Sequence, residues 1–132
     1  MRRVAAIAAL LLAAALAGCG ATGSSGASFA GEEKQIADQV EALQAAGETG
    51  NAKKLCDEVL ARSLRDSLSA PGSTCQTELD KAIKDADDFD LSVQDVAITG
   101  NRATAQVSGR GGTRTLAFAR EGADWRISSL GG

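Results

Sequence analysis

The chain has 132 residues, of which 44% are hydrophobic and 23% charged, with a formal net charge of −3 at pH 7. This length limits it to one folded domain, and the absence of a basic cluster argues against binding to nucleic acid or to an anionic lipid surface. The sequence has no His and no Tyr, which excludes chemistry that needs an imidazole or a phenol. Its three cysteines are an odd number, which needs an explanation in an exported protein.

The first 18 residues have the features of an export signal. Arg2 and Arg3 precede an apolar run, residues 4–17, that is rich in Ala and Leu. The run is shorter than the roughly 20 residues that a membrane-spanning helix needs. A basic start, a short apolar core and small residues at a cleavage site are typical of a secretory signal peptide. We therefore expect residues 1–18 to be removed from the mature protein.

The end of this segment, Leu16-Ala17-Gly18-Cys19, resembles the lipobox of bacterial lipoproteins. The resemblance implies cleavage between Gly18 and Cys19 and attachment of diacylglycerol to the Cys19 thiol. The protein would then be held by lipid on the extracytoplasmic face of the cell membrane, since two or three acyl chains anchor a protein stably. The alternative is an ordinary secretory signal in which Cys19 is incidental. Residues 19–31 are predicted to form the lipidated cysteine and a flexible tether of small residues, in which Phe29 is the one large side chain.

Three helices are predicted after the tether. In residues 32–46, Ile36, Val40 and Leu43 recur at helical spacing. Asn51 is a suitable N-cap for a second helix, which would run to Leu68 with the apolar positions Leu55, Val59, Leu60, Leu64 and Leu68. Thr74 can cap a third helix, residues 75–86, with a buried stripe of Cys75, Leu79, Ala82 and Ile83.

The apolar pattern then changes from helical to alternating, which predicts four strands at residues 89–98, 102–108, 114–120 and 123–130. A change of parity in the first strand predicts a bulge near Gln94 and Asp95, and Gly100-Asn101 suits a two-residue hairpin turn. The residues expected to point inward are Ala103, Ala105, Val107, Leu116, Phe118, Trp125 and Ile127. The sequence therefore predicts an α+β fold, with three helices followed by a four-stranded antiparallel meander.

Residues 32–130 resemble the cone-shaped nuclear transport factor 2-like fold, and in particular small lipoproteins of actinobacterial type in that superfamily. The resemblance depends on the Lys54-Leu55-Cys56 segment, the downstream Cys75 and the terminal Trp125-Arg126-Ile127. It implies helices packed on a curved sheet, although the early short strands of that fold are not evident in residues 60–73. Enzymes of the superfamily use an acid or base with Tyr or His donors in the cone, and this chain has neither donor.

If Cys19 carries lipid, Cys56 and Cys75 remain as an even pair in an oxidising compartment, which favours a disulfide. Such a bond across 18 intervening residues would contribute roughly 3 kcal/mol. The alternatives are free buried cysteines, a redox pair or a metal site. A redox pair usually has Cys-x-x-Cys spacing and a zinc site needs about four ligands, which two thiols without His do not supply. We therefore predict no cofactor and no metal.

Two sets of charged residues are candidate functional groups. The acidic stretch comprises Asp80, Asp85, Asp87, Asp88, Asp90 and Asp95. It could hold a general acid/base pair if burial separated the two pKa values, or calcium, although it lacks the Gly and distal Glu of a calcium loop. The basic set could meet an acidic partner and comprises Arg102, Arg110, Arg114, Arg120 and Arg126. For both sets a solvated surface is the default expectation. The loop at 109–112 joins two strands, so it is not a phosphate-binding loop.

The leading hypothesis is a non-enzymatic, lipid-anchored envelope domain that binds a small apolar ligand or another envelope protein. Its cone or helix–sheet cleft would be lined by Phe89, Leu91, Val107, Phe118 and Trp125, each of which could instead be plain core. A second hypothesis is an enzyme that uses a buried carboxyl, such as Asp90 or Asp95, facing a cavity. A third is a passive spacer, which should have no cavity large enough for a ligand.

Overall fold

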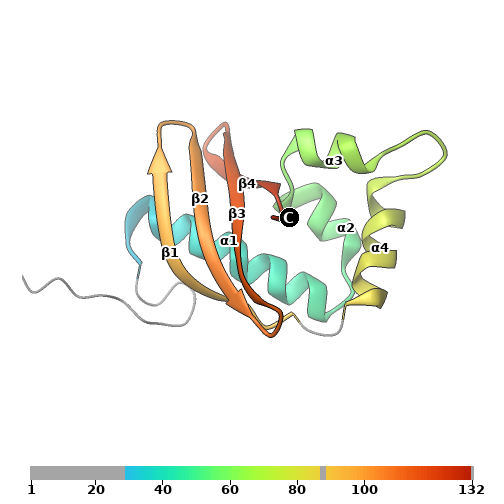
Figure 1. Ribbon diagram of the computed structural model, residues 1–132. Helices are drawn as coiled ribbons and strands as arrows, with labels where there is room; N and C mark the ends of the chain where they lie inside the picture. The colour runs from blue at the N-terminus through green and yellow to red at the C-terminus, as the bar shows by residue number, and fades with distance from the viewer. Residues whose placement is uncertain (1–28, 87–88, 132) are drawn as a thin grey trace, which may run out of the picture.

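The computed structural model describes residues 29–86 and 89–131. It has four α-helices and a four-stranded antiparallel sheet in the order β1-β2-β3-β4 (Figure 1), which confirms the predicted α+β class. The predicted signal peptide, Gly18 and Cys19 lie outside the described residues, as do most of the tether and Asp87 and Asp88. None of the helices in the described part of the chain combines the length and the apolar character that a membrane span needs.

Helix α1 (Gly31–Glu48) follows the predicted periodicity, with Ile36 and Val40 fully buried against the sheet. The helix starts at Gly31, so this residue belongs to the folded domain and not to the tether. The Phe29 side chain, just before the helix, packs against the core. In Figure 1, α1 passes behind the strands and covers one face of the sheet.

The prediction of one continuous second helix is wrong. Asn51 caps α2 (Ala52–Lys54) by accepting a hydrogen bond of 3.1 Å from the Lys54 N–H, and a π-helical turn, η1 (Leu55–Val59), follows. The chain is extended at Leu60 and resumes as α3 (Arg62–Leu68). The break has a long-range cause: Leu60 forms a parallel β-bridge with Ile127, and the Ala61 N–H donates to the Ile127 carbonyl at 2.7 Å. Pairing with the sheet overrides the local helical pattern at this point.

Helix α4 (Cys75–Asp85) begins where the sequence predicts, because the Thr74 hydroxyl accepts a hydrogen bond from the Thr77 N–H at 3.2 Å. Cys75 and Leu79 are buried, as predicted. Ala82 is exposed, and Ile83 is only partly buried, so the predicted stripe does not continue along the helix. The second half of α4 therefore leaves apolar surface uncovered.

The sheet consists of β1 (Ser92–Thr99), β2 (Arg102–Gly109), β3 (Gly112–Glu121) and β4 (Asp124–Ser129). A register shift between Val93 and Asp95 confirms the predicted bulge, and Thr99 pairs with Arg102 across the predicted turn. Phe89 and Leu91 precede β1, in contrast to the predicted strand from residue 89. The inward face of the sheet forms one core with the helices, through the buried residues Val93, Val96, Ala103, Ala105, Val107, Leu116, Phe118, Trp125 and Ile127.

Candidate functional site

The sulfur atoms of Cys56 and Cys75 lie 2.19 Å apart and form a disulfide, the pair that the sequence predicts. The bond joins η1 to α4, and both cysteines are buried. The Arg65 guanidinium donates to the Cys56 carbonyl at 3.1 Å, which links α3 to the same turn. The disulfide therefore holds the helical half of the domain together.

The five predicted pocket residues lie in different surroundings. Val107, Phe118 and Trp125 are at most 1% exposed and fill the core. The Phe89 ring lies so close to Gly47 of α1 that a Cβ at Gly47 would overlap it. Leu91 lines a hollow at the start of β1. Val107, Phe118 and Trp125 are thus part of the buried core, which is the alternative that the sequence left open for them.

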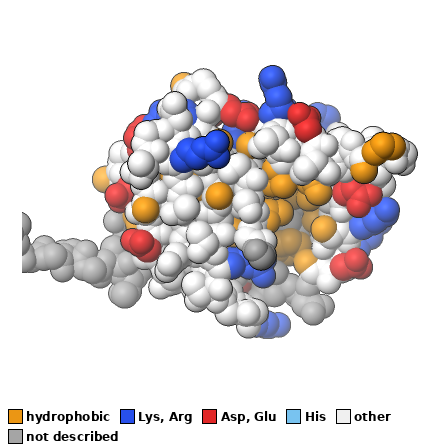
Figure 2. Space-filling model, turned by 45° about the horizontal axis from the view of Figure 1, so that its top comes forward, with side chains coloured by type: hydrophobic (Ala, Val, Ile, Leu, Met, Phe, Trp, Pro, Cys, Tyr) orange, Lys and Arg blue, Asp and Glu red, His pale blue; other side chains and the backbone are white. Residues whose placement is uncertain are grey.

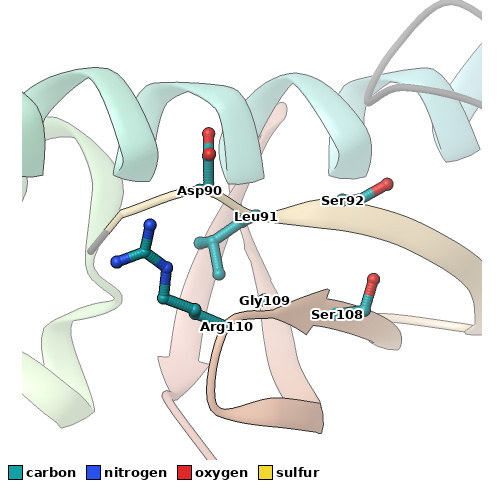
Figure 3. A pocket seen from close by; sticks show the side chains of 6 residues that line it. All are labelled: Asp90, Leu91, Ser92, Ser108, Gly109 and Arg110. Atoms are coloured by element: carbon teal, nitrogen blue, oxygen red, sulfur yellow. The ribbon is translucent and has the colours of Figure 1, made fainter. Parts of the chain in front are cut away.

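The hollow at Leu91 has a volume of about 400 Å³ and is lined by Asp90, Leu91, Ser92, Ser108, Gly109 and Arg110 (Figure 3). Asp90 and Arg110 lie at one end and the two serines at the other, with Leu91 between them. Gln44 of α1 supports this end of β1, because its side-chain oxygen accepts the Leu91 N–H at 3.2 Å. Figure 3 shows α1 running directly above these residues.

The described residues provide little for acid–base or metal chemistry. No charged residue among them is buried, and Asp80, Asp85, Asp90 and Asp95 are all exposed. No group of three or more potential metal-ligating side chains occurs within residues 29–86 and 89–131. A hydrogen bond from Ser73, with Lys81 nearby, lowers the pKa of Glu78 below its ordinary 4.5, which keeps that carboxylate charged. The enzyme hypothesis requires a buried Asp that faces a cavity, and the exposed Asp90 does not meet this requirement.

The predicted arginines occupy two kinds of site. Arg102, Arg110 and Arg114 are exposed, whereas Arg120 lies over the Trp125 ring at 4.5 Å from its centroid and forms an ion pair with Glu32 of α1. Arg126 donates to the Asp57 carbonyl at 3.2 Å. The role of Arg120 as a cover for Trp125 was not predicted from the sequence. The sequence signal for this position is the alternation of β3, because Arg120 lies an even number of residues from Leu116 and Phe118 and so is on the same, inward face of the strand.

Hydrophobic side chains gather in a depression between the sheet, α3 and α4, which we call the α3–α4 hollow (Figure 2). Helix α3 has no fully buried residue, although it carries two leucines. The partly exposed aliphatic side chains on the elements around the hollow are Leu64 and Leu68 in α3, Ile83 in α4 and Leu130 after β4. The sequence predicted Leu64 and Leu68 as core positions, and the break at Leu60 is the reason that they are not.

Another hollow, of about 640 Å³, lies at the edge of β3 and is lined by Gly111, Gly112, Thr113, Arg114, Thr115, Ser129 and Gly131. Comparisons of the chain with protein-family models, curated proteins and solved structures find no match. Function must therefore be inferred from the residues and geometry of this chain.

Proposed function

We propose that this protein is a lipid-anchored, extracytoplasmic envelope protein whose domain binds an apolar ligand or the apolar surface of another envelope protein, without catalysis. The observation that carries the proposal is the α3–α4 hollow, in which hydrophobic side chains gather (Figure 2) and on whose surrounding elements Leu64, Leu68, Ile83 and Leu130 are partly exposed. A contiguous apolar surface on a small domain is typical of a binding site. The absence of His and Tyr from the sequence supports a binding role over an enzymatic one.

A nuclear transport factor 2-like fold is part of the proposal. It is supported by the order of elements, with helices first and a four-stranded antiparallel meander after them. The parallel bridge between Leu60 and Ile127 adds a short extended segment beside the sheet, in the region where the sequence had shown no early strand. A solved structure whose sheet order or helix placement differs from that fold would contradict this part.

The membrane anchor is supported by Leu16-Ala17-Gly18-Cys19 and by the short apolar run before it. In this arrangement residues 20–30 separate the lipid from α1, which begins at Gly31. The intact mass of the membrane-fraction protein should equal that of the chain from Cys19 plus its acyl groups. Cys19→Ala should move the protein to the soluble fraction, and retention of this variant in the membrane would contradict the anchor.

The α3–α4 hollow can be tested with the dye 1-anilinonaphthalene-8-sulfonate, which fluoresces when it binds apolar protein surface. The native domain should bind the dye, and the double variant Leu64→Gln with Leu68→Gln should lose most of the fluorescence, because the two leucines are the partly exposed aliphatic side chains of the helix that borders the hollow. Ser63→Asn, an exposed change in the same helix, is the matched control. Unchanged fluorescence in a folded double variant would show that the dye binds elsewhere, and no binding by the native domain would favour the spacer hypothesis.

A further inference from the structure

One face of the sheet is left uncovered by the described helices. Helix α1 lies behind the strands in Figure 1, and no helix stands in front of β1, β2 and β3. The residues of β2 that alternate with its buried positions point to this uncovered side. Arg102, Thr104 and Gln106 are accordingly exposed. We call the surface that these three residues form with their neighbours on β1 and β3 the open face.

The register of the strands arranges the open face in rows that run across the sheet. Thr104 pairs with Ala97 of β1 and with Ala117 of β3, which gives a central row of small side chains. The rows on its two sides each contain one charge. They are Asp95, Gln106 and Thr115 on one side and Thr99, Arg102 and Ala119 on the other. Neighbouring rows are about 7 Å apart, because they are two residues apart along each strand.

Asp95 and Arg102 are charges of opposite sign at matched positions of the open face. Both are exposed, and neither belongs to an ion pair within the described residues. Along β2, Arg102 and Gln106, the residue opposite Asp95, lie two positions to either side of Thr104. The two charges are therefore equally far from the central row, on opposite sides of it.

We propose that a second copy of this chain packs on the open face, with a two-fold axis along the central row and with Asp95 of each copy beside the partner's Arg102. A rotation by 180° about the central row exchanges the two outer rows, so the Asp95 row of one copy lies over the Arg102 row of the other. The two residues are then offset by one strand, about 4.8 Å, which an arginine side chain spans. Because a two-fold interface repeats every contact, the ion pair forms twice.

The character of the open face favours a copy of itself over other occupants. The small side chains of the central row let a second sheet approach face to face, as in aligned sheet packing. An apolar partner would bury Asp95 and Arg102 without compensation, which is costly, whereas a second copy supplies the charge that each one lacks. The open face shares no residue with Leu64, Leu68, Ile83 and Leu130 of the α3–α4 hollow. The proposal therefore goes beyond the function proposed above and does not depend on it.

The test measures dimerisation of the Cys19→Ala protein, which avoids acylation, by analytical ultracentrifugation from micromolar to millimolar concentration. Asp95→Arg and Arg102→Asp should each weaken the dimer about tenfold, because each places like charges together at both pairs. Glu41→Arg, an exposed change on α1 that alters the net charge as Asp95→Arg does, is the matched control and should have no effect. Trp125 fluorescence during thermal unfolding verifies that each variant is folded.

A mixture of the two charge variants tests the pairing itself. An equimolar mixture of Asp95→Arg and Arg102→Asp should dimerise as well as the starting protein, because the two substitutions are complementary across the interface.

Cross-linking tests the position of the axis. Thr104→Cys should form an intermolecular disulfide on mild oxidation with copper phenanthroline, since the axis brings this residue next to its own copy, and the exposed Thr49→Cys should not. A protein that stays monomeric at millimolar concentration would overturn the proposal. A dimer that both charge variants retain, or a mixture no stronger than either variant alone, would overturn it as well.

Discussion

Removal of the Cys56–Cys75 disulfide should lower the stability of the domain by about 3 kcal/mol. The two cysteines are 19 residues apart. In the chain-entropy model a cross-link removes about 2.1 + 1.5R ln n cal/mol/K from the unfolded state, which is about 11 cal/mol/K for this loop and about 3 kcal/mol at room temperature. A small domain is stabilised by only about 5–15 kcal/mol in total. The bond would therefore supply a substantial share.

The comparison is between Cys19→Ala, which avoids acylation, and the same protein with Cys56→Ala and Cys75→Ala. Urea unfolding with linear extrapolation gives both free energies of unfolding, and the fluorescence of Trp125 reports the transition because this single, buried tryptophan becomes exposed. Helix α4 should lose protection from hydrogen exchange first, because Cys75 and Leu79 are its only fully buried residues. A difference below about 1 kcal/mol, with α4 as protected as before, would refute the loop-closure reasoning.

Three further predictions concern single contacts. Arg120→Ala should cost about 1 kcal/mol and shift Trp125 fluorescence to the red, since the guanidinium covers the ring; Arg102→Ala, an exposed change, should do neither. Gly47→Ala should destabilise by about 1 kcal/mol through overlap with the Phe89 ring, yet stabilise a Phe89→Ala background by about the same amount through helix propensity; additive effects would contradict that contact. The lowered pKa of Glu78 means that its contribution is present above its ordinary value of 4.5 and is lost as the pH falls through its folded value. Glu78→Gln should therefore flatten the acid side of a plot of urea midpoint against pH.

The helices and strands with strong local signals could be predicted from the sequence. The helical spacing of apolar residues was enough to place α1. The start of α4 followed from its capping residue, since Thr74 accepts the hydrogen bond expected of an N-cap. The change in the alternation of apolar residues was enough to predict the bulge between Val93 and Asp95. These features depend on residues a few positions apart, which is the range that a sequence pattern describes.

Features that depend on distant residues could not be predicted. Leu60 fits the helical pattern of its neighbours, and only the position of Ile127 makes it extended. Strand β3 is longer than β4, whereas the sequence predicted strands at 114–120 and 123–130, with the later strand the longer one. In the same way, alternation indicated that Phe118 and Trp125 point inward, but not that helices fill the space they face.

The bridge between Leu60 and Ile127 also affects the order in which this chain can fold. Strand β4 supplies Trp125 and Ile127 to the core and the hydrogen bond that separates η1 from α3, and it is the last element of the described chain. The helices made first therefore remain without their final packing partner until synthesis reaches residue 129. If the chain is exported as proposed, this order would keep it incompletely packed during translocation and let it complete its core on the far side of the membrane.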